Sequence, residues 1–240
     1  MALSFILWVT ISCILLGFWV WTLFTIFKQK KAWKFYADKK KLRYHSNGLF
    51  ETPSLSGAID EYKVSLFVSE HSELDARSHR RLTAIEVSLH SGLPISSAVA
   101  SGGMVHIVEA LDINQEYRPA HKEWDDSYII RASDNQVMQS YLNDDRLEQV
   151  LKLMKTEKVW IVLLFLDGKG LLRLDTPLPI DNPKSLDKLI KQMISVAQAL
   201  ELGKGEEKGL LRKRKEDDSA PVLALDEDIL DDDIGLELEE

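Results

Sequence analysis

The sequence predicts an α+β protein: an N-terminal transmembrane helix, then a mostly antiparallel sheet with packed helices, then a disordered acidic tail. Three observations lead to this prediction. Residues 3–27 carry no charged side chain, the middle of the chain alternates apolar and polar residues in paired segments, and residues 216–240 hold twelve acids and no base. Strand pairs with helices between and after them, rather than in strict alternation, are typical of the α+β class.

The net charge of −8 hides an uneven distribution along the 240 residues. Residues 28–43 carry eight Lys or Arg and one Asp, whereas the charged residues among the last 25 are all Asp or Glu. Blocks of like charge at the edges of a balanced centre usually mark interaction arms. Length and charge together predict four segments: a transmembrane anchor at 1–27, a basic juxtamembrane segment at 28–45, a cytoplasmic α+β domain at 46–202, and a disordered basic-then-acidic tail at 203–240.

The apolar segment 3–27 is long enough to cross a membrane. As an α-helix its 25 residues would extend roughly 38 Å, which exceeds the ~30 Å hydrocarbon core of a bilayer. A cleaved signal peptide is the alternative, but the basic start, the shorter apolar core and the small-residue cleavage site that it requires are missing. Cys13 is the lone cysteine, so the chain forms no internal disulfide, which fits a reducing compartment.

The basic residues follow the apolar segment, and this decides the predicted orientation. The positive-inside rule places the N-terminus outside and the rest in the cytoplasm, as a single-pass protein of the cell inner membrane. The same side chains either set topology alone or also contact anionic lipid, at around 1 kcal/mol each. They are Lys28, Lys30, Lys31, Lys34, Lys39, Lys40, Lys41 and Arg43. Trp19 and Trp21, or Trp33 and Tyr36, are the candidate aromatic anchors at the membrane surface.

Alternation of apolar and polar residues predicts the strands of the domain. The candidates are 61–70, 82–90 and 127–133. The first two are joined by a polar loop and predict an antiparallel pair, and a turn-rich entry at 47–57 precedes them. The clearest local signal is a hairpin over 159–174, in which Asp167 and Gly168 supply the positive φ of a tight turn.

Capping residues predict where the helices begin. Asp134, Asn143 and Ser185 each precede apolar residues at helical spacing, and the last of these helices presents an apolar face that continues to Leu200. A short helix is also expected after the pair of glycines at 102–103, where Met, Ile, Val and Leu recur at helical spacing. The domain therefore closes on an amphipathic helix.

No catalytic or metal-binding motif stands out, and we predict no cofactor. The six histidines lack the spacing of a metal site, and His71 and His79 are expected to be solvated in the polar loop. The carboxylates Glu123, Asp125 and Asp126, with His121, favour one alternative, a small membrane-bound enzyme with a carboxylate site near 121–128. A solvated turn is the simpler interpretation of these residues. The acidic body and tail argue against nucleic acid as a partner.

The order of features resembles a group of bacterial single-span membrane proteins whose cytoplasmic domain has no assigned function. The resemblance is carried by Gly57, by Asp125 and Tyr128 before the strand, by "SYLNDDRLEQVLKLM" at 140–154, and by the hairpin and final helix that follow. It covers about residues 30–202. It implies the topology and the domain boundary, and it implies no catalytic residues.

The predicted function is that of a membrane-tethered cytoplasmic adaptor or scaffold that recruits a protein partner through its acidic tail. A tail needed only for solubility would not require large apolar residues, yet this one keeps Leu230, Ile234, Leu236 and Leu238. The spacing of 230, 234 and 238 suits an amphipathic helix in a partner's groove, while 236 and 238 alternate as in an added strand. The alternatives are a tail without a dedicated partner and an accessory subunit of a membrane complex.

Overall fold

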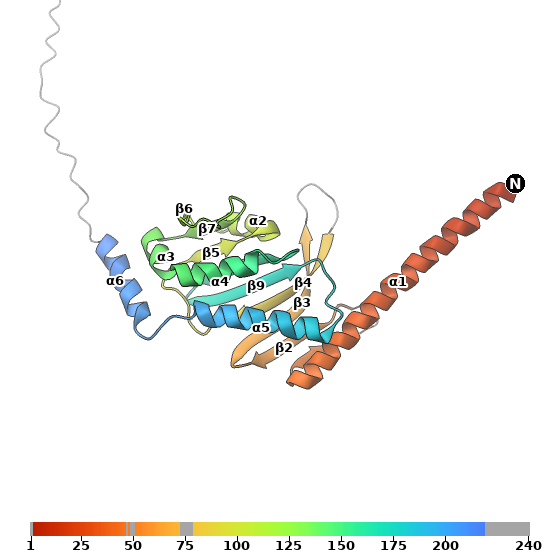
Figure 1. Ribbon diagram of the computed structural model, residues 1–240, viewed down its shortest axis with the longest axis horizontal. Helices are drawn as coiled ribbons and strands as arrows, with labels where there is room; N and C mark the ends of the chain where they lie inside the picture. Colours follow the sequence, from red (N-terminus) through yellow and green to blue (C-terminus); the bar gives the residue numbers. More distant parts are fainter. Residues whose placement is uncertain (1, 47, 49–50, 73–78, 219–240) are drawn as a thin grey trace, which may run out of the picture.

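The computed structural model describes residues 2–46, 48, 51–72 and 79–218. These residues form an α+β fold (Figure 1). The tail residues Leu230, Ile234, Leu236 and Leu238, for which a partner-binding role is predicted, lie outside the described residues. A long apolar helix leads into an antiparallel sheet with packed helices, so the predicted fold class is confirmed.

The described strands form a nine-stranded sheet in which every pairing is antiparallel. Its spatial order is β1-β2-β3-β4-β9-β8-β5-β7-β6. The last two strands of the sequence, β8 and β9, therefore lie at the centre of the sheet, between β4 and β5. The strands are β1 (Arg43–His45), β2 (Ser54–Ile59), β3 (Tyr62–Ser72), β4 (His79–Ser88), β5 (Ser97–Ala100), β6 (Gln115–Glu116), β7 (Ile129–Ala132), β8 (Trp160–Leu166) and β9 (Lys169–Thr176).

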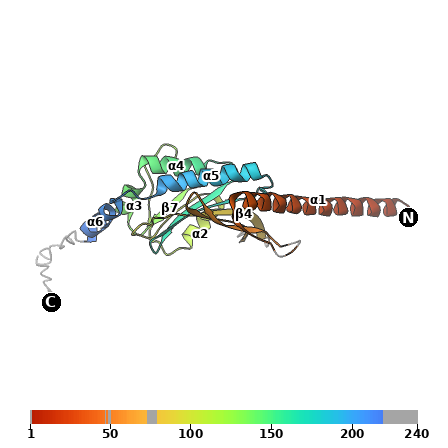
Figure 2. The same cartoon turned by 90° about the horizontal axis from the view of Figure 1, so that it is seen from below.

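The helices lie on both faces of this sheet. They are α1 (Ala2–Lys40), the 3₁₀ turn η1 (Gly102–Met104), α2 (Val105–Glu109), α3 (Asn135–Tyr141), α4 (Asp144–Met154), α5 (Pro183–Leu200) and α6 (Glu206–Asp218). Figure 2 shows α4 and α5 on one side and α2 on the other. The main core fills the space between the sheet and the α4–α5 layer, and a smaller apolar cluster lies under α2.

The two predicted hairpins are present. β3 pairs antiparallel with β4, and both strands extend into the segment that was predicted to be a polar loop, because their pairing continues to Ser72 and His79. β8 and β9 are joined by Asp167 and Gly168, with φ of 51° and 69°. Two successive positive φ angles define the type I′ turn, which matches the twist of the strands it joins.

Two local predictions are wrong. The final helix begins at Pro183 and not after Ser185, because the side chain of Asn182 accepts the hydrogen bond from the Lys184 N–H and caps the helix three residues earlier. The segment predicted to be a turn-rich entry ends in β2, in which Gly57 pairs with Val64. The predicted caps Asp134 and Asn143 are confirmed by the hydrogen bonds that their side chains accept.

Helix α1 continues without a break from the apolar segment into the core of the domain. It is long and apolar enough to cross a membrane, and none of its most apolar window is buried in the protein. Its C-terminal half contacts α5, β1 and β2. Trp33 is 0% exposed, and its indole Nε1–H donates to the backbone oxygen of Ile180 at 2.9 Å.

The position of Trp33 and Tyr36 corrects one suggestion from the sequence. Both were candidate anchors at the membrane surface, but they are buried in the domain core, together with Ala37. The reason is helical periodicity, which places the three side chains on one face of α1, directed at α5 and the edge of the sheet. Trp19 and Trp21 remain exposed on the apolar part of the helix, at 57% and 71%.

Candidate functional site

The carboxylates near 121–128 do not converge on a common site. Glu123 is paired with Lys155 at 2.6 Å, Asp126 with Arg118, and the side chain of Asp125 accepts a hydrogen bond from the Ser127 N–H at 2.8 Å. The hydrogen bond from Lys155 lowers the pKa of Glu123. Each carboxylate is exposed and is turned toward its own neighbour, so the arrangement is that of a solvated turn leading into β7.

The histidines also fail to assemble a metal site. Among the residues that the structure describes, no group of three or more His, Cys, Asp or Glu side chains is placed to hold a metal ion. Within the same part of the chain, His121 lies beside Glu123, whose backbone N–H donates to His121 Nδ1 at 3.2 Å. That contact stabilises the turn and brings no second ligand.

The basic residues after the apolar segment divide into two groups. Three of them contact the domain: Lys28 pairs with Asp181 at 2.7 Å, Lys40 lies 3.7 Å from Asp187, and Lys30 donates to a backbone oxygen. The other five have exposed side chains and are Lys31, Lys34, Lys39, Lys41 and Arg43. Contact of these eight residues with lipid stays a prediction.

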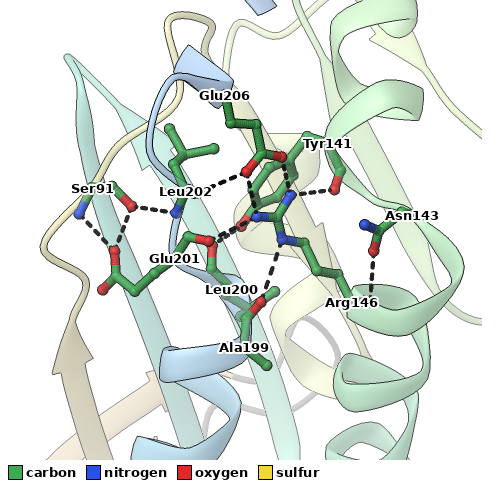
Figure 3. Close-up of polar contacts among 10 residues, drawn as sticks. Ser91, Tyr141, Asn143, Arg146, Ala199, Leu200, Glu201, Leu202 and Glu206 are labelled. Carbon is green, nitrogen blue, oxygen red and sulfur yellow. Dashed lines mark hydrogen bonds and ion pairs between the residues drawn. The ribbon is translucent and has the colours of Figure 1, made fainter. Parts of the chain in front are cut away.

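A buried polar cluster that was not predicted from the sequence lies at the end of the domain away from α1. Arg146 of α4 is 7% exposed, and five hydrogen bonds leave its guanidinium group, which has five N–H groups (Figure 3). Three go to backbone oxygens, those of Tyr141, Ala199 and Glu201. The remaining two go to both carboxylate oxygens of Glu206, at 2.5 and 2.8 Å.

These contacts fasten α6 to the domain, and we call them the Arg146 clasp. The Arg146 hydrogen bond lowers the pKa of Glu206, and the Glu206 carboxylate in turn raises the pKa of Arg146. Tyr141, whose OH donates to the Leu200 oxygen at 2.7 Å, lies under the guanidinium with its ring centroid 4.5 Å away. A bidentate pair of this kind fixes direction as well as distance.

A second set of contacts at the same end ties the β4–β5 turn to the last residues of α5. The carboxylate of Glu201 accepts hydrogen bonds from the backbone N–H of His90 at 2.8 Å and of Ser91 at 2.9 Å, and also one from the Ser91 hydroxyl. The Ser91 hydroxyl oxygen then accepts a bond from the Leu202 N–H at 2.9 Å. Figure 3 shows both sets meeting at the corner where α5 ends. The corner is therefore rigid before α6 begins.

The face of the sheet that points away from α4 and α5 holds another polar cluster that was not predicted. Asp175 of β9 is fully buried and is bonded to His71 Nε2 at 2.8 Å, to the Ser69 hydroxyl at 2.9 Å, and to Arg173 through both carboxylate oxygens. Arg173 also reaches Glu86 at 3.3 Å. Burial raises the pKa of Glu86, although the nearby guanidinium opposes this.

This cluster holds three strands together and lacks the geometry of a nucleophilic centre. The Asp175 carboxylate orients the imidazole of His71, but the Ser69 hydroxyl donates to Asp175 and not to His71, so no hydroxyl is paired with a base. The expectation that His71 is solvated is wrong. Its position follows from the extension of β3, because residues 67, 69 and 71 alternate with the apolar 64, 66 and 68 and so face away from the core.

Comparison with known proteins adds a distant structural likeness. No family model and no curated protein sequence matches the chain. Among solved structures, the chain is similar to the mycobacterial trehalose monomycolate transport factor A, TtfA, with 9% sequence identity and a TM-score of 0.41. The match covers 72% of this chain and 94% of that one.

Proposed function

We propose that the protein is a membrane-tethered adaptor or scaffold, which holds its α+β domain against the cytoplasmic face of the inner membrane and recruits a protein partner through its acidic tail. One observation carries this proposal: α1 passes without interruption from the exposed apolar segment into the core of the domain. The charges that follow the apolar segment supply the orientation, through the positive-inside rule.

The continuity of α1 leaves little distance between membrane and domain. The buried Trp33 lies six positions after Phe27, the end of the uncharged segment, and at 1.5 Å per residue this is a rise of about 9 Å. A flexible linker would let the domain diffuse around its anchor, whereas a helix fixed in the core does not. The body of the protein therefore stays at the level of the lipid headgroups.

The placement of α6 supports a role for the tail. Both views place α6 at the end of the body opposite to α1 (Figures 1 and 2), and the Arg146 clasp fixes its first turn. The chain beyond Asp218 thus starts on the side away from the anchor. Its spaced leucines and isoleucines suit the groove of a partner, and its carboxylates suit a basic rim around that groove.

The test is a pull-down of full-length protein from membranes, compared with a chain lacking residues 216–240. Loss of a specific partner on deletion is expected. The triple variant Leu230→Ser, Ile234→Ser, Leu238→Ser keeps every charge and should lose the same partner. The matched control changes Val222, Leu223 and Leu225 to Ser, which removes three aliphatic residues outside the proposed spacing, and it should retain binding.

Three outcomes would contradict this proposal. If the deleted chain co-purifies with the same proteins as the parent, the tail recruits nothing. If the parent migrates on blue-native gels as a discrete large species that the deletion leaves unchanged, the protein is instead an accessory subunit held through its anchor or its domain. A protease-accessible reporter after Glu240 in right-side-out vesicles would contradict the proposed orientation.

A further inference from the structure

The end of the domain from which α1 leaves contains two adjoining hollows. The larger has a volume of about 380 Å³ and lies between the start of α5, the turn from α4 to β8, and the linker from β9 to α5; we call it the α5 hollow. The smaller, of about 140 Å³, lies between α1 and the sheet. Pro179 lines both, so they are neighbours.

Both hollows lie at the level where the apolar part of α1 ends. Ile26, in the last turn before the first lysine, lines the smaller one. Asp181 lines the α5 hollow and is paired at 2.7 Å with Lys28, the first charged residue of α1. If the apolar segment crosses the bilayer, the headgroups lie beside Lys28 and thus beside Asp181 of the α5 hollow.

The lining of the α5 hollow is apolar inside and polar at its edge. Val159, Ile180 and Leu189 supply the apolar part, and Leu178 stands beside them with 47% of its side chain exposed. Outside α1, the large exposed apolar side chains in the described part of the chain are Leu178 and Leu211. An exposed leucine at a hollow is a feature expected where an apolar ligand enters, and polar groups around it fix the orientation of that ligand.

We propose that the α5 hollow binds one acyl chain of a membrane lipid; the proposal rests on the membrane-tethered role proposed above. Continuity with the bilayer selects this occupant, because the apolar part of α1 ends beside the two hollows and would bring acyl chains next to them. The volume is near the lower end of the range for ligand sites, which suits one chain and not two. The exposed Lys188 on the rim would meet an anionic headgroup.

The experiment uses the full chain in nanodiscs of phosphatidylcholine and phosphatidylglycerol that contain a trace of phospholipid with a photoreactive group on its acyl chain. Cross-links are expected at residues lining the hollow, between 156 and 192, as well as on α1. Leu178→Asp places a charge at the mouth and should reduce the cross-links in 156–192 by at least about fivefold, since burying an unpaired charge is costly. Leu189→Trp should reduce them by filling the hollow.

Leu211→Asp is the matched control, because it adds the same charge at the other large exposed apolar side chain of the domain. Its cross-links should equal those of the parent. Leu178 is half exposed, so its replacement leaves folding intact even if Leu189→Trp does not. Cross-links confined to α1, or unchanged in Leu178→Asp, would overturn the lipid site while leaving the tethered role standing. Failure of the parent chain to enter nanodiscs at all would overturn the tethered role.

Discussion

The two ends of the domain are joined to their helices by opposite kinds of contact. At the end from which α1 leaves, α1 is held by buried aromatic and small side chains, with Trp33 and Tyr36 packed in the main core. At the other end, α6 is held by Leu210 and by the charged pair of Arg146 and Glu206. Apolar packing responds little to pH, whereas an ion pair depends on the charge of both partners.

The two attachments therefore differ in how they can be lost. Removing α1 would open the core, so the anchor and the domain are one folding unit. Detaching α6 from the domain would expose Leu210 and free the Arg146 guanidinium from Glu206, while the sheet and the α4–α5 layer would keep their packing. The anchor attachment is therefore expected to fail only when the domain unfolds, and the α6 attachment to open on its own.

The largest effect is expected from Trp33→Ala. Truncating a fully buried tryptophan removes its packing and its hydrogen bond to Ile180, and should cost about 3–5 kcal/mol of the free energy of unfolding. Urea unfolding of the full chain in detergent micelles, followed by circular dichroism, measures this loss. Trp19→Ala is the control on the same helix, at an exposed position of its apolar part, and should leave the midpoint unchanged. Equal midpoints for both variants would mean that α1 is not part of the core.

Arg146→Met comes next. It leaves the Glu206 carboxylate and three backbone oxygens without their donor and should cost about 2–3 kcal/mol, because hydrogen bonds to charged groups are lost in a nearly buried site. Hydrogen exchange should accelerate in α6 more than in β8 or β9. The exposed Arg212 of α6 provides the control, since Arg212→Met should change neither. A uniform acceleration through the sheet would show that the clasp belongs to the core.

A smaller and evenly spread effect is expected from Gly168→Val. The turn between β8 and β9 places Gly168 at a φ of 69°, a conformation that a β-branched residue adopts only with strain, at a cost of about 1–2 kcal/mol. The melting temperature of the full chain should fall, while exchange in α6 relative to the sheet should not rise. An unchanged melting temperature would contradict the strain that the turn implies. This variant separates loss of global stability from release of one end.

The smallest effect is the pH dependence of α6. The pKa of Glu206 is depressed in the folded chain by the Arg146 hydrogen bond, so its contribution to stability is complete above its ordinary value of 4.5 and is lost as the pH falls through the depressed pKa. The protection of the α6 amides against hydrogen exchange, relative to their intrinsic rates, should therefore fall selectively in acid. Glu206→Gln should exchange faster at neutral pH and lose most of this pH dependence. A parent protein whose α6 is equally protected at both pH values would contradict the prediction.

Local signals in the sequence predicted much of the fold, and contacts between distant segments account for most of what it missed. The caps at Asp134 and Asn143 and the Asp167–Gly168 turn are each specified within a few residues, so they could be predicted. Arg146 and Glu206 lie 60 residues apart, and nothing near either one identifies its partner. The same holds for His71, whose partner Asp175 is 104 residues away and is brought near by the insertion of β9 beside β4.

Because α1 is one unbroken helix, the rotation of the domain about the helix axis is fixed relative to the apolar segment. An α-helix turns by about 100° per residue, so each side of the apolar part of α1 corresponds to one fixed side of the domain. A neighbour in the bilayer that docks on one flank of α1 would therefore always find the same strands and helices above it. One residue inserted directly after Phe27 would rotate the domain by about 100° around the helix axis relative to the apolar segment, while Lys28 and Trp33 would keep their places against the domain. The number of helical residues between the apolar segment and the core thus sets both the distance of the domain from that segment and its rotation about the helix axis.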